Sequence, residues 1–156
     1  MKKKTIILLS LVVLLILIQL IRVDQTNPES NPKYDYFVVE SVPANAQAII
    51  RESCYDCHSN QTVYPWYSKI APASWFLQNH INEGRHEFNY SEWGNYSSKD
   101  KKEMLEDMIK MIDEDEMPLK SYLLIHRNAR LTDEEKTILR QLFLKESATG
   151  AVASLN

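Results

Sequence analysis

Apolar residues recur at helical spacing through most of the chain, and no stretch alternates between apolar and polar residues as a half-buried strand would. A first helix is predicted to begin near Ser41 and Pro43 and to deliver Cys54 at or just beyond its end. A second helix is predicted over 72–83, ending at Gly84, and a third over 98–113. The pattern therefore predicts a mostly α fold.

The last predicted helix begins at a capping box, in which Thr132 and Glu135 each reach back to the other's backbone amide. Its apolar positions continue through Phe143. Small and polar residues dominate after Ala148, so we expect a flexible tail over 147–156.

The N-terminus combines a basic start with a long apolar run. Lys2, Lys3 and Lys4 precede an apolar segment over 5–21, which Arg22 closes. The length is close to the roughly 20 residues that cross a bilayer as a helix. No A-x-A-like cleavage site follows, which predicts an uncleaved membrane anchor over 1–23. The basic flank favours an orientation with residues after about 24 outside the cytoplasm.

Beyond the anchor, residues 24–35 are predicted to form an extended linker, because two prolines stand among Asn, Ser and Glu. About 110 residues over 36–146 then suffice for one domain. Removing Lys2, Lys3, Lys4 and Arg22 from the 18 basic residues leaves 14 against 21 acidic ones, a formal charge of −7. This charge argues against a nucleic-acid partner. It fits either ordinary solubility or the steering of a basic redox partner.

The most specific motif is Cys54-Tyr55-Asp56-Cys57-His58, which contains both cysteines of the chain. This C-x-x-C-H pattern is typical of covalent c-type haem attachment. Two thiols at this spacing reach the two vinyl groups of one haem, and the following imidazole binds the iron from the proximal side. The motif predicts one covalently attached haem c, held by Cys54, Cys57 and His58.

Three other interpretations of the motif remain open. A thioredoxin-like redox pair needs a surrounding βαβ pattern, which the flanks lack. A structural zinc site needs four ligands, and the partners would have to be His80, His86 and His126 at unusual separations. A lone disulfide between Cys54 and Cys57 is compatible with an oxidising compartment.

The identity of the second axial ligand decides whether haem iron transfers electrons or binds a small molecule. Met117 is the leading candidate, because it precedes Pro118 just after the predicted helix over 98–113. Three other methionines, Met104, Met108 and Met111, fall within the helical pattern and are expected to fill gaps in the core. Three histidines compete with Met117 for the distal position: His80, His86 and His126.

His58 is expected to donate its second ring N–H to a backbone carbonyl, which fixes the tautomer. Pro65 and Pro72 each lie in a segment that offers such a carbonyl. Aromatic residues are candidates for the walls of the haem pocket. The expected pocket residues are Pro65, Trp66, Tyr67, Pro72, Trp75 and Trp93.

Several segments resemble the bacterial haem-binding domain proteins, small membrane-anchored relatives of class I cytochrome c. The matching segments are 54–60, 62–67, 70–72, 89–93 and Met117-Pro118, with Tyr122 and His126 following. They extend over 36–144. The resemblance implies covalent haem on Cys54 and Cys57, with His58 proximal and Met117 distal. The chain departs from ordinary cytochrome c after the motif, where residues 64–67 replace a glycine-rich loop.

These features together predict an electron carrier rather than an enzyme. It is expected to be a single-pass protein of a bacterial inner membrane, with its C-terminal domain in the periplasm and another redox protein as partner. The alternative is a haem-based sensor of gas or another ligand, in which the distal ligand is displaceable. Peroxidase-like activity is a further variant of that alternative.

Overall fold

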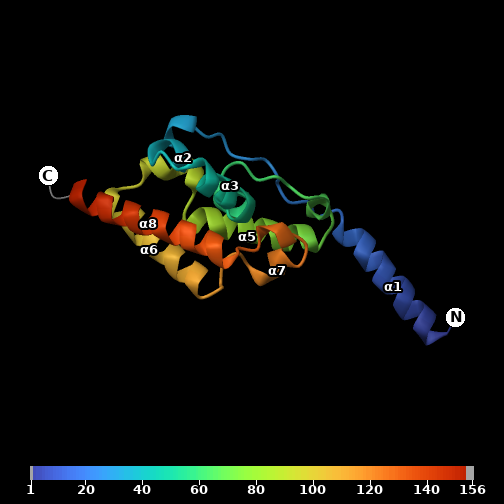
Figure 1. Cartoon of the computed structure of the whole chain (residues 1–156). Coiled ribbons are helices and arrows are strands. Elements are labelled where there is room, and N and C mark those ends of the chain that lie inside the picture. The colour runs from blue at the N-terminus through green and yellow to red at the C-terminus, as the bar shows by residue number, and fades with distance from the viewer. Residues whose placement is uncertain (1, 154–156) are drawn as a thin grey trace.

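The computed structural model describes residues 2–153, with side chains described through residue 149, and this part of the chain is mostly helical, as predicted (Figure 1). It contains no strand within these residues. Short 3-10 helices connect the α-helices. The α-helices are α1 (Lys3–Ile18), α2 (Tyr36–Val39), α3 (Ala44–Ser53), α4 (Tyr55–His58), α5 (Ala73–Glu87), α6 (Ser98–Asp113), α7 (Lys120–Leu123) and α8 (Asp133–Ala153). The 3-10 helices are η1 (Pro32–Tyr34), η2 (Trp66–Lys69), η3 (Tyr90–Asn95) and η4 (Arg127–Ala129).

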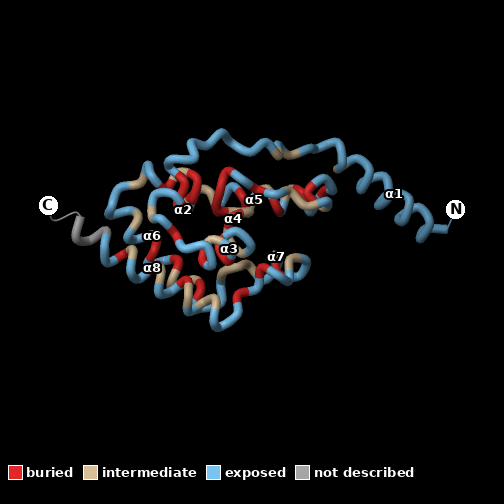
Figure 2. Tube along the Cα trace, turned by 45° about the horizontal axis from the view of Figure 1, so that its top comes forward, coloured by how far each residue is buried: buried red, intermediate tan, exposed pale blue. Residues whose placement is uncertain are grey.

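Helix α1 projects from one end of the protein, and none of its residues is buried (Figures 1 and 2). Its 16 residues rise about 24 Å, which is short of the roughly 30 Å thickness of a bilayer's hydrocarbon core. Within residues 2–153, no helix is both long and apolar enough to cross a membrane. The transmembrane helix predicted over 1–23 is therefore not supported by the structure.

Helices α6 and α8 lie side by side and form the most extensive helix pair (Figure 1). α6 has the predicted bounds, and the Ser97 hydroxyl caps it by accepting the Asp100 amide at 3.2 Å. The capping box of α8 is confirmed. The Thr132 amide donates to Glu135 Oε2 at 2.8 Å, and the Glu135 amide donates to Thr132 Oγ1 at 3.3 Å.

Helix α3 begins and ends close to its predicted limits, and Cys54 follows directly, as expected. The prediction for α5 was wrong at its C-terminal end, because α5 continues through Gly84 to Glu87. Gly84 does not adopt a positive φ, so it does not act as a helix terminator. It is instead the point where α5 comes closest to α4, as described below.

An aromatic cluster connects α2 to α4 and η3. Tyr36 packs edge-on against Trp93, with ring centroids 4.9 Å apart, and Phe37 stacks on Tyr55 at 4.8 Å. Tyr90 lies between them, 5.0 Å from Tyr36 and 5.4 Å from Tyr55. Each such pair contributes about 0.5–1.5 kcal/mol beyond simple burial. The cluster therefore fixes the position of α4, which carries the second half of the cysteine motif.

The predicted linker over 24–35 is extended over 24–31 and runs along the domain. Asn27 donates its side-chain amide to the Thr62 carbonyl at 3.0 Å and accepts Arg85 Nη2 at 2.9 Å. Gln25 donates to the carbonyl of Ser68. These hydrogen bonds hold the segment against the domain.

At the other end of the chain, α8 is helical past Ala148, where the sequence predicts a flexible tail. Ser147 is buried, and Thr149 Oγ1 donates to the Lys145 carbonyl at 2.8 Å. Residues 154–156 of the predicted tail lie outside the described residues.

Glu146 on α8 is a partly buried carboxyl group. The Tyr36 hydroxyl donates to its Oε2 at 2.6 Å, whereas Oε1 is buried without a hydrogen-bond partner. Burial raises the pKa of Glu146 to about 7, and the nearby Glu40 carboxylate acts in the same direction. The Tyr36 hydrogen bond, Lys145 and Lys101 oppose this rise in pKa.

A pH-dependent stability follows from the raised pKa of Glu146. The folded state retains the proton that the unfolded chain loses above about pH 4.5, so this group's contribution to stability falls as pH rises from about 4.5 to 7. We expect a loss of roughly 2 kcal/mol after allowance for partial exposure. In urea unfolding at a series of pH values, Glu146→Gln should lack this loss. Glu134→Gln, an exposed change on the same helix, should keep it, and parallel profiles for all three proteins would contradict the assignment.

Candidate functional site

The cysteine motif is folded into one tight turn. Cys54 ends α3, and its carbonyl accepts the amides of Cys57 at 3.2 Å and His58 at 3.0 Å. The single turn of α4 thus holds both thiols and the imidazole close together, as the motif predicts.

The two residues between the cysteines anchor this turn to other elements. The Tyr55 hydroxyl donates to Asp35 Oδ2 at 2.6 Å, at the start of α2. Asp56 Oδ1 accepts the Val63 amide at 2.9 Å, and Oδ2 accepts the Tyr122 hydroxyl of α7 at 2.8 Å. Contacts with Asp35, which precedes the motif in sequence, and with Val63 and Tyr122, which follow it, therefore hold the turn of α4 in place.

The two residues after the motif bind it to η3. The Asn60 amide donates to Ser91 Oγ at 3.0 Å, and Asn60 Oδ1 accepts the Asn89 side chain at 2.7 Å. Ser59 Oγ donates back to the Tyr55 carbonyl at 2.7 Å. These four polar residues are all buried, so their hydrogen bonds within the protein replace the ones they would make to water. They are Ser59, Asn60, Asn89 and Ser91.

Two adjoining cavities flank the motif, with volumes of about 360 Å³ and 500 Å³. His58 and Met117 line both cavities. Cys54 lines the smaller cavity and Cys57 the larger. Their volumes fall within the roughly 300–1,000 Å³ typical of cofactor sites. The structure thus brings the four central predicted residues to one place.

Met117 reaches this place through a turn after α6. Asp115 adopts a positive φ of 55°, which reverses the chain, and the Met117 amide then donates to the Met111 carbonyl at 3.1 Å. The side chain of Asp115 pairs with Lys136 of α8. Met117 lies outside any helix, as predicted, so its thioether is not committed to a helix face.

His58 is buried and stacks on Phe88, with ring centroids 4.1 Å apart. Its Nδ1 lies 3.4 Å from the Phe88 carbonyl. The prediction that a carbonyl near Pro65 or Pro72 would accept this contact was wrong, because the end of α5 supplies the carbonyl. Burial lowers the pKa of His58 to about 4, so the imidazole is neutral near pH 7. With the Nδ1 proton directed at Phe88, the Nε2 lone pair is available to a metal.

The two thiols form no disulfide. Burial raises the pKa of Cys54 to about 12 and that of Cys57 to about 11. A redox-active pair depends instead on a thiolate stabilised by a lowered pKa. Within residues 2–153, no group of three or more His, Cys, Asp or Glu is arranged to hold a metal ion. The geometry favours neither a thioredoxin-like pair nor a zinc site.

The three competing histidines lie in different surroundings. His126 Nε2 is hydrogen-bonded to the Tyr67 hydroxyl at 2.8 Å, and its ring stacks on Tyr122. His80 lines the larger cavity only, with Nδ1 2.8 Å from the Phe76 carbonyl. His86 is exposed. Of Met117 and these three histidines, Met117 alone lines both cavities with His58; Met111 lines both as well, but it belongs to helix α6.

None of the six expected wall residues lines either cavity. Trp93 is fully buried in the aromatic cluster, whereas Trp66 is 73% exposed. Other residues form the walls, and sequence reasoning missed most of them. The apolar wall residues of the smaller cavity are Phe88, Tyr90, Met104, Met108, Met111, Ile112 and Phe143. The helical stripe of α6 identified the interior face of that helix but not that a cavity adjoins it.

Gly84 allows α5 to approach the motif. A Cβ atom at this position would lie 2.8 Å from the Cys57 carbonyl oxygen and 3.3 Å from Cys57 Cβ. We expect Gly84→Ala to lower the free energy of unfolding by about 1–2 kcal/mol, because the clash outweighs alanine's better helix propensity. Urea unfolding tests this, with Asn82→Ala on the exposed side of α5 as control. Equal stability of the two variants would contradict the close-approach explanation.

The site as a whole is a mostly apolar cleft with a neutral imidazole and a thioether on its lining. Imidazole and thioether are ligands that haem iron accepts in electron-transfer proteins, so the residues present fit a haem. The fold and site thus define a small helical protein with a haem-type cleft.

Comparison with known families agrees with this class. The family model for the haem-binding domain matches residues 13–145. The chain belongs to the haem-binding domain family, which supports haem as its ligand. No curated protein and no solved structure matches the chain.

Proposed function

We propose that this protein is a monohaem c-type cytochrome, similar to class I cytochromes c, that carries single electrons between extracytoplasmic redox proteins. It is not itself an enzyme. The observation that carries the proposal is that His58 and Met117 line the same two adjoining cavities, with one cysteine of the motif at each. A haem whose iron has both axial positions filled supplies reversible one-electron chemistry and leaves no position for a substrate.

Cys54 and Cys57 would hold the haem covalently. Each thiol would add across one vinyl C=C bond, with sulfur going to one carbon and hydrogen to the other, so attachment would need no external oxidant or reductant. Their high pKa values favour the neutral thiol until attachment. The hydrogen bonds of Tyr55 and Asp56 keep the turn of α4 in place during this addition.

His58 and Met117 would supply the axial ligands. The Phe88 carbonyl orients the His58 ring and keeps its proton on Nδ1. The Asp115 turn holds Met117 beside the same cavities. The methionines and aromatic residues of the smaller cavity would shield a bound haem from water, and such shielding favours the less charged, reduced state of a redox group.

Membrane association is part of the same proposal. Apart from Ser10, the side chains of α1 from Ile6 to Leu17 are apolar and exposed, and exposed large apolar residues of this kind need an apolar partner. Lipid hydrocarbon covers such a helix on every face, and Lys2, Lys3 and Lys4 would meet anionic headgroups. The extracytoplasmic side is the compartment in which haem c is attached in bacteria, so we place the domain in the periplasm.

Voltammetry of the full-length holoprotein tests the electron-carrier proposal. We expect one reversible one-electron wave, unchanged by carbon monoxide and by peroxide. A catalytic wave with peroxide, or a wave displaced by carbon monoxide, would favour the sensor or peroxidase-like alternative. Fractionation of expressing cells tests the membrane association separately: the protein should remain with membranes after alkaline washing, and its release would contradict that part.

A further inference from the structure

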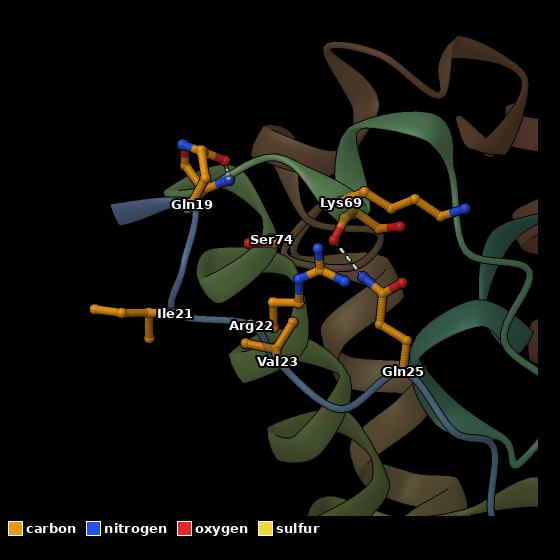
Figure 3. A pocket seen from close by; sticks show the side chains of 9 residues that line it. Gln19, Ile21, Arg22, Val23, Gln25, Lys69 and Ser74 are labelled. Carbon is orange, nitrogen blue, oxygen red and sulfur yellow. Dashed lines mark hydrogen bonds between the residues drawn. The ribbon is translucent and has the colours of Figure 1, made fainter. Parts of the chain in front are cut away.

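One end of the domain is joined to α1 by hydrogen bonds. The side chain of Gln19, the residue after α1, donates to the Ala71 carbonyl at 3.0 Å and accepts the Ala71 amide at 2.9 Å. Trp75 Nε1 donates to the Ile21 carbonyl at 2.9 Å. Figure 3 shows this junction, with the Ile21 side chain directed away from the domain. From this end α1 projects outward (Figures 1 and 2).

Two segments distant in sequence form this end of the domain. η2 and Ile70 directly precede Ala71, and the Tyr67 hydroxyl of η2 lies 2.8 Å from Nε2 of His126, which follows α7. α7 accordingly lies at the end from which α1 projects (Figures 1 and 2). We call the exposed residues of 62–76 and 119–127 the basal surface.

Large apolar side chains are concentrated on the basal surface. Leu124 is 77% exposed, Trp66 73% and Phe76 58%. Of the ten exposed large apolar residues that follow residue 22 in the described part of the chain, six belong to this surface. The other three are Val63, Ile70 and Ile125. Exposed apolar residues gathered in this way mark a contact with a protein or a membrane.

The segments at this end of the domain contain basic residues but no Asp or Glu. They are residues 1–23, 61–82 and 117–132, and the 21 acidic residues of the chain all lie elsewhere. Eight of the 18 basic residues are in these segments. Two of the eight, Lys120 and Arg130, line a pocket beside Asp115 and are partly compensated by it.

Lys69 and Arg127 are the cations of the basal surface that are available to a partner. Both are exposed, and neither is in an ion pair among the described residues. Lys69 shares its pocket with no carboxylate, and its side chain extends away from the junction in Figure 3. Arg127 lines a groove with Glu52 and Asp56, but the Asp56 carboxylate already accepts two hydrogen bonds from the domain.

We infer that the basal surface rests on an anionic lipid bilayer, with Trp66 and Leu124 entering the headgroup region and Lys69 and Arg127 facing lipid phosphates. Tryptophan favours this region because its ring is apolar and its N–H is polar. Anionic headgroups attract lysine and arginine side chains near the membrane surface. Apolar residues flanked by cations, without acidic residues, match both layers of such a surface.

The inference rests on the membrane association of α1 proposed above. Because α1 projects from the basal end, a bilayer that covers α1 also meets the basal surface. A single lipid phase then covers both sets of exposed apolar side chains, which favours a bilayer over a protein as the occupant. The contact would fix the orientation of the domain, and therefore of the haem cleft, relative to the membrane.

Photo-crosslinking of the full-length holoprotein in lipid nanodiscs tests this contact. The discs contain phosphatidylglycerol and a phospholipid with a diazirine in its headgroup, and mass spectrometry identifies the crosslinked peptides. We expect crosslinks in residues 1–23 and in peptides of the basal surface, but only background yield in α6. In discs of phosphatidylcholine alone, the yield of the basal surface relative to that of 1–23 should fall about threefold or more.

Two double variants separate the charged and apolar parts of the basal surface. Lys69→Gln combined with Arg127→Gln should lower the relative yield about threefold or more in the anionic discs. Trp66→Ser combined with Leu124→Ser should lower it to a similar extent. None of these four residues lines the haem cleft, so the haem absorption spectrum should stay unchanged.

Lys99→Gln combined with Lys102→Gln is the matched control, because it removes two exposed cations from α6 and should leave the relative yield unchanged. Crosslinks confined to residues 1–23 would overturn the inference, leave the membrane association of α1 intact and favour a protein as the occupant. Unchanged yields in both basal variants would also overturn it. Background yield throughout the chain, including 1–23, would refute the membrane association as well.

Discussion

Replacing both Cys54 and Cys57 with alanine is expected to abolish covalent haem attachment. The unmutated chain, exported in a bacterial host that matures c-type cytochromes, should carry one haem that remains bound after denaturation. The double variant should have the mass of the polypeptide alone, because no thiol remains to add to a vinyl group. Mass spectrometry of the denatured proteins measures this difference directly.

Ser53→Ala is the matched control, because Ser53 lines the larger cavity without offering a thiol. It should retain the full haem mass. If the unmutated protein instead carries no haem and is lighter by two hydrogens, a disulfide between the cysteines would be the correct interpretation.

Replacing Met117 with alanine is expected to open the distal position. The reduced variant should bind carbon monoxide readily, whereas the unmutated protein should not. The reduction potential should also fall, on the order of 100 mV, because methionine ligation favours reduced iron. Optical titration in an electrochemical cell gives both quantities from one sample.

Met104→Ala provides the control for the same cavity. Met104 is a partly buried methionine that lines the smaller cavity with Met117. The Met104→Ala variant should lose packing contacts in the cavity wall, but its absorption spectrum should remain insensitive to carbon monoxide. If Met104→Ala but not Met117→Ala became sensitive to carbon monoxide, Met104 would be the distal ligand and our assignment of Met117 would be wrong.

The sequence predicts the elements whose signals are local. The capping box at Thr132 and the apolar stripe of α6 are read within one helix, and both agree with the structure. The position of Met117 after α6 is similarly local, because acidic residues and Pro118 end the helix there. Single-helix patterns were sufficient for these features.

The sequence does not predict features that depend on contacts between distant segments. In the sequence Gly84 is typical of a helix terminator, but in the structure its missing side chain leaves room for the Cys57 carbonyl of α4. The carbonyl near His58 Nδ1 belongs to Phe88, 30 residues away, and no local pattern reveals that approach.

Aromatic residues show the same limit. Trp93 and Trp66 are equally plausible wall residues from composition alone, but the first is enclosed by Tyr36 and Tyr90 and the second lies at the surface. The α6 methionines were expected to fill the core, and Met108 belongs to it with Met104 packed against it, but Met104, Met108 and Met111 all also line the smaller cavity of the haem-type cleft. Periodicity identifies a helix face that points inward, but not whether side chains or a cofactor fill the space there.

The apolar N-terminal run is the largest difference between prediction and structure. Its composition predicts a membrane-spanning helix, but α1 ends at Ile18, and Gln19 is hydrogen-bonded to Ala71 of the domain. The residues after Ile18 therefore belong to a junction with the domain, where Gln19 bonds to Ala71 and the Ile21 carbonyl accepts Trp75 Nε1.

X-ray absorption at the iron edge of the full-length holoprotein identifies the distal ligand, because sulfur bound to iron is distinguished from nitrogen. We expect, in both oxidation states, five nitrogen neighbours and one sulfur, with the sulfur absent in Met117→Ala. Six nitrogen or oxygen neighbours without sulfur would exclude Met117 as the distal ligand. Five such neighbours and no sulfur would show that the distal position is open and would contradict the electron-carrier assignment.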